Sequence, residues 1–180
     1  HLHAYMPNAG FPDVRDEIAR QLSESTGLDY TRDHVLMTVG AGGALNTLLK
    51  AILDPGDEVI ALAPFFVEYG FYAENHGGKL VLVDTDSAFQ LDLDAIERAI
   101  TPRTKAIIVN SPNNPTGVIY PQSALAELGK RLEGLDQSIT VISDEPYKAL
   151  SFDQAPVPEV PASIPRTVIA TSWSKALALP

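Results

Sequence analysis

The sequence contains no cysteine among its 180 residues. Disulfide frameworks, thiol nucleophiles and zinc sites built from cysteine are therefore excluded. Basic residues are also scarce, with 13 Lys and Arg against 23 Asp and Glu, which gives a formal net charge of −10. Nucleic acids and anionic membranes need a basic surface, so this charge argues against both as partners. An anionic ligand would have to be held by local donors.

Long apolar runs are missing as well. The longest apolar stretch, residues 59–67, is interrupted by Pro64 and is too short to cross a bilayer. No segment has the pattern of a signal peptide, and there is no repeat or low-complexity tract. The composition, 45% hydrophobic and 20% charged, is typical of a globular chain that folds without a metal or disulfide. Because the chain starts at His1 without a Met and stops at Pro180 directly after a lysine motif, we expect it to be a piece of a longer protein.

Short apolar runs rich in β-branched residues alternate along the chain with helical periodicities. Runs such as 107–109 and 141–142 are apolar on both faces, which favours a parallel sheet covered by helices on both sides. Four prolines between residues 156 and 165 predict a stiff surface loop rather than a domain linker. The sequence therefore predicts one α/β domain of three layers with a mostly parallel sheet. The expected strands are 35–39, 58–63, 79–83, 106–110, 139–143 and 167–171. The expected helices are one that follows an Asp13 cap and stops at Gly27, one that carries Leu45, Leu48, Leu49 and Ile52 after a glycine turn, and those at 65–75, 91–100 and 122–133.

Ligands of such sheets bind at the carboxyl ends of the strands. The first predicted strand is followed by a glycine turn, residues 40–43, that enters a helix and could bring backbone N–H groups to a phosphate. The dinucleotide-binding fingerprint fails here, since its third glycine would fall at Leu45, and no Gly-Lys-Ser/Thr of a P-loop is present. On its own, this turn could equally serve close packing.

Three further segments follow predicted strands. Residues 110–117, Asn-Ser-Pro-Asn-Asn-Pro-Thr-Gly, describe a rigid loop with three amides. Residues 144–147 are Asp-Glu-Pro-Tyr, and residues 172–175 are Ser-Trp-Ser-Lys. Each segment alone could be a turn, a helix cap or a solvated charge. Together they place a phosphate cradle, amides, a carboxylate with a phenol, and a lysine at successive strand ends.

This set, in this order, resembles the large domain of fold-type I pyridoxal-phosphate (PLP) enzymes, and specifically the class I and II aminotransferases. The resemblance runs from Tyr5 to Pro180 and rests on Asn-Asn-Pro-Thr-Gly, Asp-Glu-Pro-Tyr and Ser-Trp-Ser-Lys at their spacing. It implies that residues 1–180 are part of a PLP-transferase large domain, incomplete at both ends, with the small domain absent.

The resemblance also implies catalytic roles. Lys175 would form the internal aldimine with the cofactor and carry a proton for the substrate, which requires a deprotonated amine. Asp144 would face the pyridine nitrogen and keep the ring protonated. Asn114 and Tyr147 would hydrogen-bond the phenolate oxygen of the ring. Phe66 would stack on the ring face, although it could equally pack in the core beside Phe65.

For the phosphate, the resemblance implies a turn formed by Gly40, Ala41 and Gly42, with help from hydroxyl groups that follow the last strand. Many relatives carry a hydroxyl residue in the turn itself, and this chain has none. Tyr5 resembles the tyrosine that reaches the phosphate of the neighbouring subunit, which implies a homodimer with a shared active site. No metal is expected. The hydroxyl residues are Ser172 and Ser174, and the histidines, which match no metal spacing, are His1, His3, His34 and His76.

The expected activity is transamination between an amino acid and a 2-oxo acid, in cytoplasmic amino-acid metabolism. A PLP-dependent lyase, decarboxylase or synthase remains an alternative, as does a non-catalytic PLP-binding sensor domain, and a plain nucleotide-binding domain ranks last. The family's arginines for the phosphate and for the substrate carboxylate lie outside these residues, because Arg103, Arg131 and Arg166 do not match their positions. We therefore expect the 180 residues alone to be inactive, and the preferred amino acid cannot be inferred.

Overall fold

The computed structural model describes residues 5–152 and 155–179. The chain divides into two compact units, His1–Val39 and Gly40–Pro180. No helix among the described residues combines the length and the hydrophobicity that a membrane span requires.

The first unit contains the helix α1 (Pro12–Thr26) and the 3-10 helix η1 (Arg32–His34). The helix α1 ends as predicted at Gly27, whose φ of 72° is a left-handed conformation that glycine adopts without strain. Asp13 lies in the first turn and is not the N-cap residue, a position that Phe11 occupies.

The strand predicted at residues 35–39 is not formed. The backbone N–H of Val35 donates to the carbonyl of Arg32 in η1, and that of Met37 donates to the carbonyl of Ala9, so these groups bond to a 3-10 helix and to a loop instead of in a ladder. A β-branched run becomes a strand only where a neighbouring strand can pair with it, and the described residues provide none here. Accordingly Leu36 and Val39 are exposed, the latter to 94%.

The second unit is built on a five-stranded sheet in the order β2-β1-β3-β4-β5, with every pairing parallel. The predicted parallel sheet is therefore confirmed. The register aligns the last residues of β3 and β4, Asn110 and Asp144, and pairs Asp144 with Ala170 at the end of β5. The strands are β1 (Glu58–Ala63), β2 (Lys79–Asp84), β3 (Thr104–Asn110), β4 (Thr140–Asp144) and β5 (Thr167–Ala170).

The helices of this unit largely follow the prediction. The helix before β2 begins later than expected, at Glu68, and the helix before β3 is capped by the side chain of Asp92, which accepts from the N–H of Ala95. The proline-rich loop contains a short helix that the sequence did not predict. The helices are α2 (Gly40–Ile52), α3 (Glu68–Glu74), α4 (Leu93–Ala99), α5 (Gln122–Glu133), α6 (Val160–Ser163) and α7 (Trp173–Ala176), with a 3-10 helix η2 (Lys148–Leu150).

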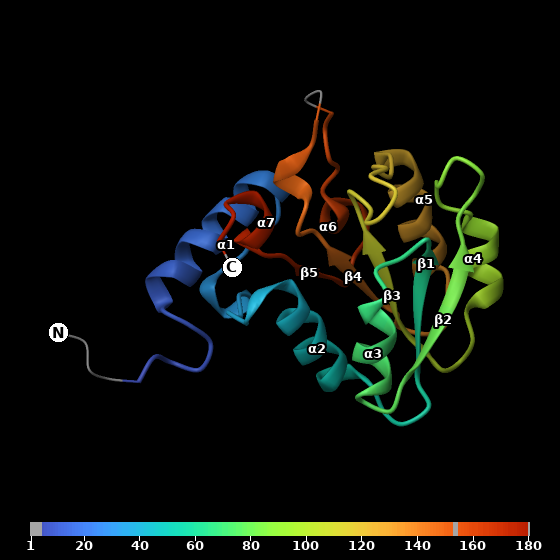
Figure 1. The fold of residues 1–180 in the computed structure, drawn as a ribbon, viewed down its shortest axis with the longest axis horizontal. Coiled ribbons are helices and arrows are strands. Elements are labelled where there is room, and N and C mark those ends of the chain that lie inside the picture. Colours follow the sequence, from blue (N-terminus) through green and yellow to red (C-terminus); the bar gives the residue numbers. More distant parts are fainter. Residues whose placement is uncertain (1–4, 153–154, 180) are drawn as a thin grey trace. The chain divides into compact units, whose positions relative to one another are not determined.

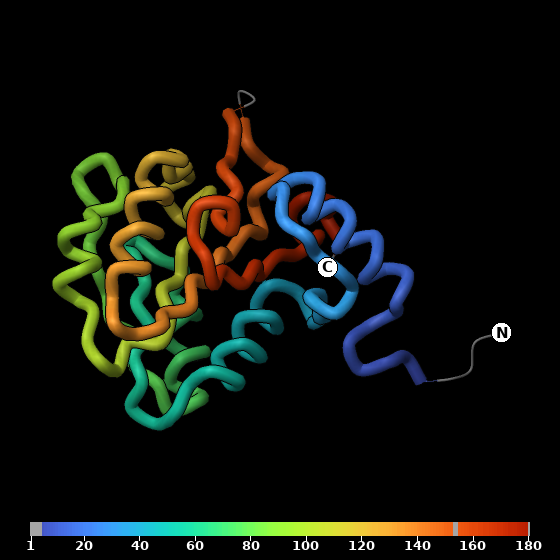
Figure 2. Tube along the Cα trace, turned by 180° about the vertical axis from the view of Figure 1, so that it is seen from behind, coloured from blue at the N-terminus to red at the C-terminus, as the bar shows by residue number. Residues whose placement is uncertain are grey.

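The sheet separates two hydrophobic cores, one on each face (Figures 1 and 2). Alternate residues of β1 illustrate the division: Val59 packs with α2 and α3, whereas Ile60 packs with α4, α5 and α6. Because both faces are covered, the central strands are apolar throughout, as the sequence predicted. The three-layer arrangement is therefore confirmed for this unit.

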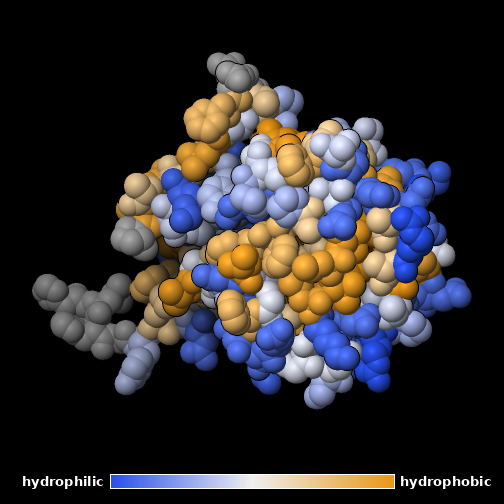
Figure 3. Space-filling view, turned by 45° about the vertical axis from the view of Figure 1, so that its right-hand side comes forward, coloured by the Kyte–Doolittle hydropathy of each residue, from blue (hydrophilic) through white to orange (hydrophobic). Residues whose placement is uncertain are grey.

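The sheet has an exposed edge at β2. Leu82 on this strand and Val67 and Phe71 beside it in the α3 region are more than half exposed, at 53%, 68% and 63%. The space-filling view from this side shows apolar side chains gathered in the middle of the face (Figure 3). Charged residues occupy both ends of the strand, Lys79 and Asp84, and they limit how freely another strand could pair with it.

The proline-rich loop is anchored to the domain by α6 rather than lying wholly on the surface. Val160 and Pro161 are buried, and Gly129 in α5 allows the two helices to approach closely. A Cβ atom at position 129 would lie 2.5 Å from the carbonyl oxygen of Ser163.

We therefore expect Gly129→Ala to lower the free energy of unfolding by about 1–3 kcal/mol, because backbone must move to relieve the clash. Gly70→Ala in α3 is the matched control, since its Cβ would meet Leu80 at 3.9 Å, an ordinary contact. That variant should gain up to about 1 kcal/mol from helix propensity. Urea unfolding monitored by circular dichroism measures both, and equal effects of the two substitutions would contradict the close approach.

Candidate functional site

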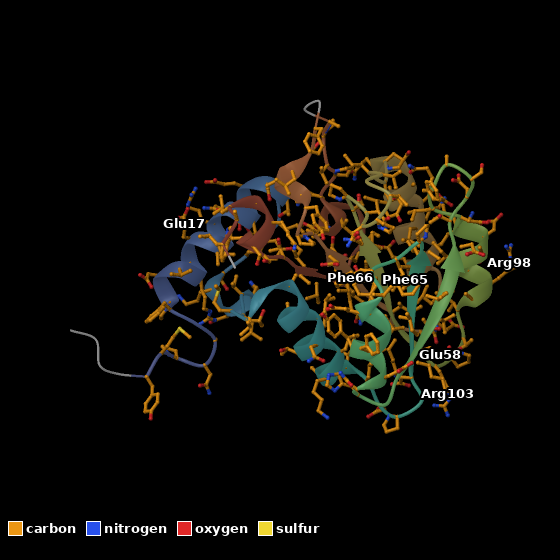
Figure 4. All side chains as sticks on the ribbon, viewed as in Figure 1. Glu17, Glu58, Phe65, Phe66, Arg98 and Arg103 are labelled. Carbon is orange, nitrogen blue, oxygen red and sulfur yellow. The ribbon has the colours of Figure 1, made fainter. Side chains whose placement is uncertain are left out.

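A cavity of about 300 Å³ lies at the carboxyl ends of the strands, within the second unit. Figure 4 shows this polarity of the sheet, with Glu58 at the start of β1 and Phe66, which follows its end, at opposite ends of the strand. The cavity brings together residues from five segments that are distant in sequence. Its lining is Gly40, Ala41, Gly42, Leu45, Phe66, Glu68, Tyr72, Asn110, Asn114, Asp144, Pro146, Tyr147, Ser172, Ser174 and Lys175.

Asp144, the last residue of β4, is buried with 4% of its surface exposed. Its Oδ2 accepts a hydrogen bond from the hydroxyl of Tyr69 and a longer one, 3.4 Å, from Asn110 Nδ2. Its Oδ1 is buried and has no hydrogen-bond partner among the described residues. Burial raises the pKa of Asp144 to about 6, the bond from Tyr69 opposes that rise, and the nearby Glu145 adds to it. One carboxylate oxygen is thus held in place and the other lacks a partner.

Tyr69 and Asn110 are site residues to which the sequence analysis assigned no role. Tyr69 lies three residues after Phe66 and the two rings meet edge to face at 5.7 Å. Burial, followed by the neighbouring Asp144, raises the pKa of the Tyr69 hydroxyl, which therefore remains a donor at neutral pH. The helical spacing from Phe66 was the available signal for Tyr69.

Asn110 connects the strand ends. Its Nδ2 donates to the carbonyl of Asp144 at 2.9 Å, and its Oδ1 accepts from the backbone N–H of Asn114 at 2.7 Å. Asn114 Nδ2 in turn lies 3.4 Å from the hydroxyl of Tyr147. The rigid loop predicted at 110–117 therefore places Asn114 and Tyr147 together at the cavity wall.

A buried ion pair supports this side of the site. Glu145, 4% exposed, accepts from Ser143 Oγ at 2.6 Å and from Lys148 Nζ at 2.8 Å, and Lys148 also pairs with Glu159 at 2.6 Å. These contacts fix the segment between β4 and η2 on which Tyr147 lies. The first two contacts are local, two and three residues apart, whereas the pair of Lys148 with Glu159 spans 11 residues.

The predicted phosphate turn forms the first turn of α2, beginning at Gly40. The first N–H groups of a helix have no partner within it, and no acidic residue occupies this first turn. Ser172 caps α7 by accepting from the N–H of Ser174 at 2.9 Å, and the hydroxyls of these two serines are 2.6 Å apart. Both serines line the same cavity as the turn. The structure therefore brings five of the six predicted phosphate residues to one cavity, and Tyr5 is not in its lining.

Lys175 on α7 lines the same cavity but is an exposed residue. The burial that was expected to favour its neutral amine is not provided by the described part of the chain. Phe66 is half-buried and combines both of its expected roles, because it lines the cavity and also packs against the core that contains Leu45 and Tyr69. Figure 4 shows it beside Phe65 on the segment that leads into α3.

Other predicted residues are not part of the lining of this cavity. Tyr5 belongs to the first unit and is fully exposed. His34 accepts from the N–H of Thr31, His76 contacts Asn46, and His1 and His3 lie outside the described residues. No group of three or more metal-binding side chains occurs among the residues that the structure describes.

The fold and site define a parallel α/β domain that gathers a buried carboxylate, a phenol, amides, hydroxyls and a lysine at its strand ends. The model of the family "Aminotransferase class I and II" matches residues 1–180, so the chain belongs to this family. The expected resemblance is thereby confirmed.

Individual relatives agree with this assignment. The chain is 41% identical over 177 residues to a probable aspartate/prephenate aminotransferase of Thermus aquaticus, covering 97% of this chain and 46% of the relative. A mutant aspartate aminotransferase of Thermus thermophilus superposes with a TM-score of 0.91 at 39% identity over 98% of this chain and 48% of that one. An aminotransferase from Eubacterium rectale gives a TM-score of 0.95 at 36% identity, over 99% and 46% of the two chains. The chain thus spans about half the length of the relatives it matches.

The buried carboxylate of Asp144 is expected to make the free energy of unfolding depend on pH. Because burial raises its pKa to about 6, the ionised carboxylate destabilises the fold above that pH, and this cost disappears as pH falls toward 4 and the folded state binds the proton. Asp144→Asn should therefore raise the free energy of unfolding at pH 8 by roughly 1–3 kcal/mol, since each pKa unit is worth about 1.4 kcal/mol.

The gain from Asp144→Asn should shrink at pH 4.5. Urea unfolding at the two pH values measures it. Asp84→Asn is the matched control, because Asp84 also ends a strand but is exposed, and it should change stability by less than about 0.5 kcal/mol. A variant less stable than wild type at pH 8 would mean that the hydrogen bonds from Tyr69 and Asn110 outweigh the burial of the charge.

Proposed function

We propose that the protein containing this chain is a PLP-dependent aminotransferase that exchanges an amino group between an amino acid and a 2-oxo acid. One observation carries the proposal: the buried Asp144 presents an oxygen without a partner among the described residues, and it lines the same cavity as Lys175. A carboxylate in that state fits a ligand that brings its own buried cationic N–H group. A protonated pyridine ring is such a ligand.

When bound, PLP supplies an electron-withdrawing pyridine ring and an aldehyde carbon that can take up an amino group. Asp144 Oδ1 would accept a hydrogen bond from the ring nitrogen, while Tyr69 and Asn110 keep the carboxylate oriented through Oδ2. The positive ring nitrogen would also offset the burial that now raises the pKa of Asp144. Asp144 would thus gain the partner that its Oδ1 lacks, and its carboxylate would keep the ring nitrogen protonated.

Lys175 is the residue for covalent attachment and proton transfer. Its amine would hold the cofactor aldehyde and, once free, would move a proton between the substrate α-carbon and the cofactor. An ordinary lysine has a pKa of about 10.4, so it must be covered to act as a base. Since Lys175 is exposed in the described residues, the cofactor or further protein has to cover it.

Three other residues would position the ring. Asn114 and Tyr147, already 3.4 Å apart, would donate to the ring oxygen, and Phe66 would lie against the ring face. The phosphate would meet the first turn of α2 at Gly40, Ala41 and Gly42 and the hydroxyls of Ser172 and Ser174. A helix N-terminus with hydroxyl donors suits a dianion even in a protein with a net charge of −10.

The names of the relatives guide the choice of substrate. Aspartate appears in the names of both Thermus proteins, so L-aspartate is the first amino acid to test.

We further propose a homodimer in which the exposed Tyr5 of one subunit serves the phosphate site of the other, and a cytoplasmic location, where amino acids and 2-oxo acids are available. The relatives reported above are all aminotransferases, so nothing favours a lyase, a decarboxylase or a sensor domain.

Transamination can be tested on the complete polypeptide that contains this sequence. The protein is loaded with PLP and mixed with single amino acids, and the absorbance of the cofactor is followed together with the products. Conversion to the pyridoxamine form with release of a 2-oxo acid is expected, with L-aspartate among the active substrates. Release of ammonia or carbon dioxide instead would contradict transamination.

Attachment at Lys175 has its own test. Borohydride reduction fixes PLP to the lysine that holds it, and mass spectrometry of peptides should find the label on the peptide with Lys175. Lys175→Ala should abolish the label. Lys79→Ala should leave it unchanged, because Lys79 lies at the start of β2, away from the carboxyl ends of the strands. A label that persists in Lys175→Ala would contradict the assignment.

A further inference from the structure

The hydroxyl of Tyr72 lies where a side chain at position 42 would begin. Gly42 has no side chain, and a Cβ atom placed on it would be 2.8 Å from Tyr72 Oη and 3.6 Å from Cζ. Both residues line the strand-end cavity, although Gly42 is on α2 and Tyr72 is on α3. The Tyr72 hydroxyl thus lies in the space that a side chain at position 42 would fill.

The position of the Tyr72 hydroxyl matters because the predicted phosphate turn, Gly40-Ala41-Gly42, has few hydrogen-bond donors of its own. Ser172 Oγ lies 4.0 Å from where a Cβ of Gly40 would be. The turn Gly40-Ala41-Gly42 contains no hydroxyl, and among the described residues the cavity lining contains no arginine. An anion held by the first turn of α2 would therefore have the Ser172 hydroxyl near Gly40 and the Tyr72 hydroxyl near Gly42.

We infer that Tyr72 is a phosphate-binding residue of this protein, with its hydroxyl taking the place of the hydroxyl side chain that the turn lacks at Gly42. The inference rests on the proposed function, because it assumes that the phosphate of PLP occupies the cradle. It adds a residue that neither the motif nor the glycine turn indicated, since Tyr72 lies 30 residues further along the chain.

Tyr72 is prepared to act as a donor. Its hydroxyl donates to the carboxylate of Glu68, one turn earlier on α3. Burial, and then this bond, raise the pKa of Tyr72 to about 12, so the proton stays on the phenol at neutral pH. Tyr72 packs against the core that contains Leu45 and Tyr69 and also lines the cavity.

Glu68 accepts the hydrogen bond that the Tyr72 hydroxyl has to release before it can donate to a phosphate. Its carboxylate also lines the cavity and would repel a phosphate if it stayed close. Glu68 is an exposed residue, however, so water can solvate its carboxylate when the bond to Tyr72 is released. The Tyr72 proton then turns from Glu68 to a phosphate oxygen, and the carboxylate moves into solvent. No covalent bond is made or broken.

A double-mutant cycle between positions 42 and 72, made in the complete polypeptide, tests the inference. For each variant, the dissociation constant of PLP is compared with that of pyridoxal, which lacks the phosphate. Tyr72→Phe should weaken PLP binding by about tenfold, the order expected for one hydrogen bond to a charged group, and leave pyridoxal binding unchanged. Adding Gly42→Ser to Tyr72→Phe should restore PLP binding to within about threefold of wild type, because the Phe ring leaves room for the serine. Gly42→Ser alone should weaken binding, since its Cβ would crowd Tyr72 Oη at 2.8 Å.

Tyr120→Phe is the control, because it removes a hydroxyl from a buried tyrosine in the core on the other face of the sheet and should not change either constant. Equal PLP affinities of wild type and Tyr72→Phe would overturn the inference. So would an equal loss for PLP and pyridoxal, or a double variant no better than Tyr72→Phe. A wild-type protein that binds neither compound would instead contradict the proposed function, so the two failures are distinguishable.

Discussion

The candidate site depends on the burial of one carboxylate at the end of a central strand. Asp144 is held on one oxygen by Tyr69 and Asn110, and its burial would be unfavourable if the other oxygen stayed without a partner. The parallel register makes this arrangement possible, because it brings the ends of β3, β4 and β5 to the same edge. The cavity forms at that edge, and the lysine, amide and hydroxyl groups gather around the carboxylate.

Much of this could be predicted from the sequence because the information is local. The strands around 58–63 and 106–110 are apolar on both faces, and Gly27 ends the first helix in the conformation that glycine favours. The strand-end motifs could be placed at one edge because all strands of a parallel sheet point the same way. Family resemblance then supplied roles that composition and periodicity could not.

The remainder depended on contacts between distant segments. Residues 35–39 have the composition of a strand, but a strand also needs a partner, which is not a property of the segment itself. Tyr72 is ordinary in its own helix and becomes notable only because Gly42 on another helix leaves space for its hydroxyl. The pairing of Lys148 with Glu159, 11 residues further along the chain, was likewise not indicated by the sequence. Motifs identify which residues matter, and packing determines which neighbours they act through.

The exposed edge at β2 has a consequence of a different kind. A strand whose backbone groups face solvent beside Val67 and Phe71 offers a template for further strands, and only Lys79 and Asp84 at its ends oppose this. The acidic charge of the chain keeps molecules apart at low ionic strength, and added salt weakens that repulsion. Association through this edge is therefore expected to increase with ionic strength, and a lysine in place of the exposed Leu82 is expected to improve solubility.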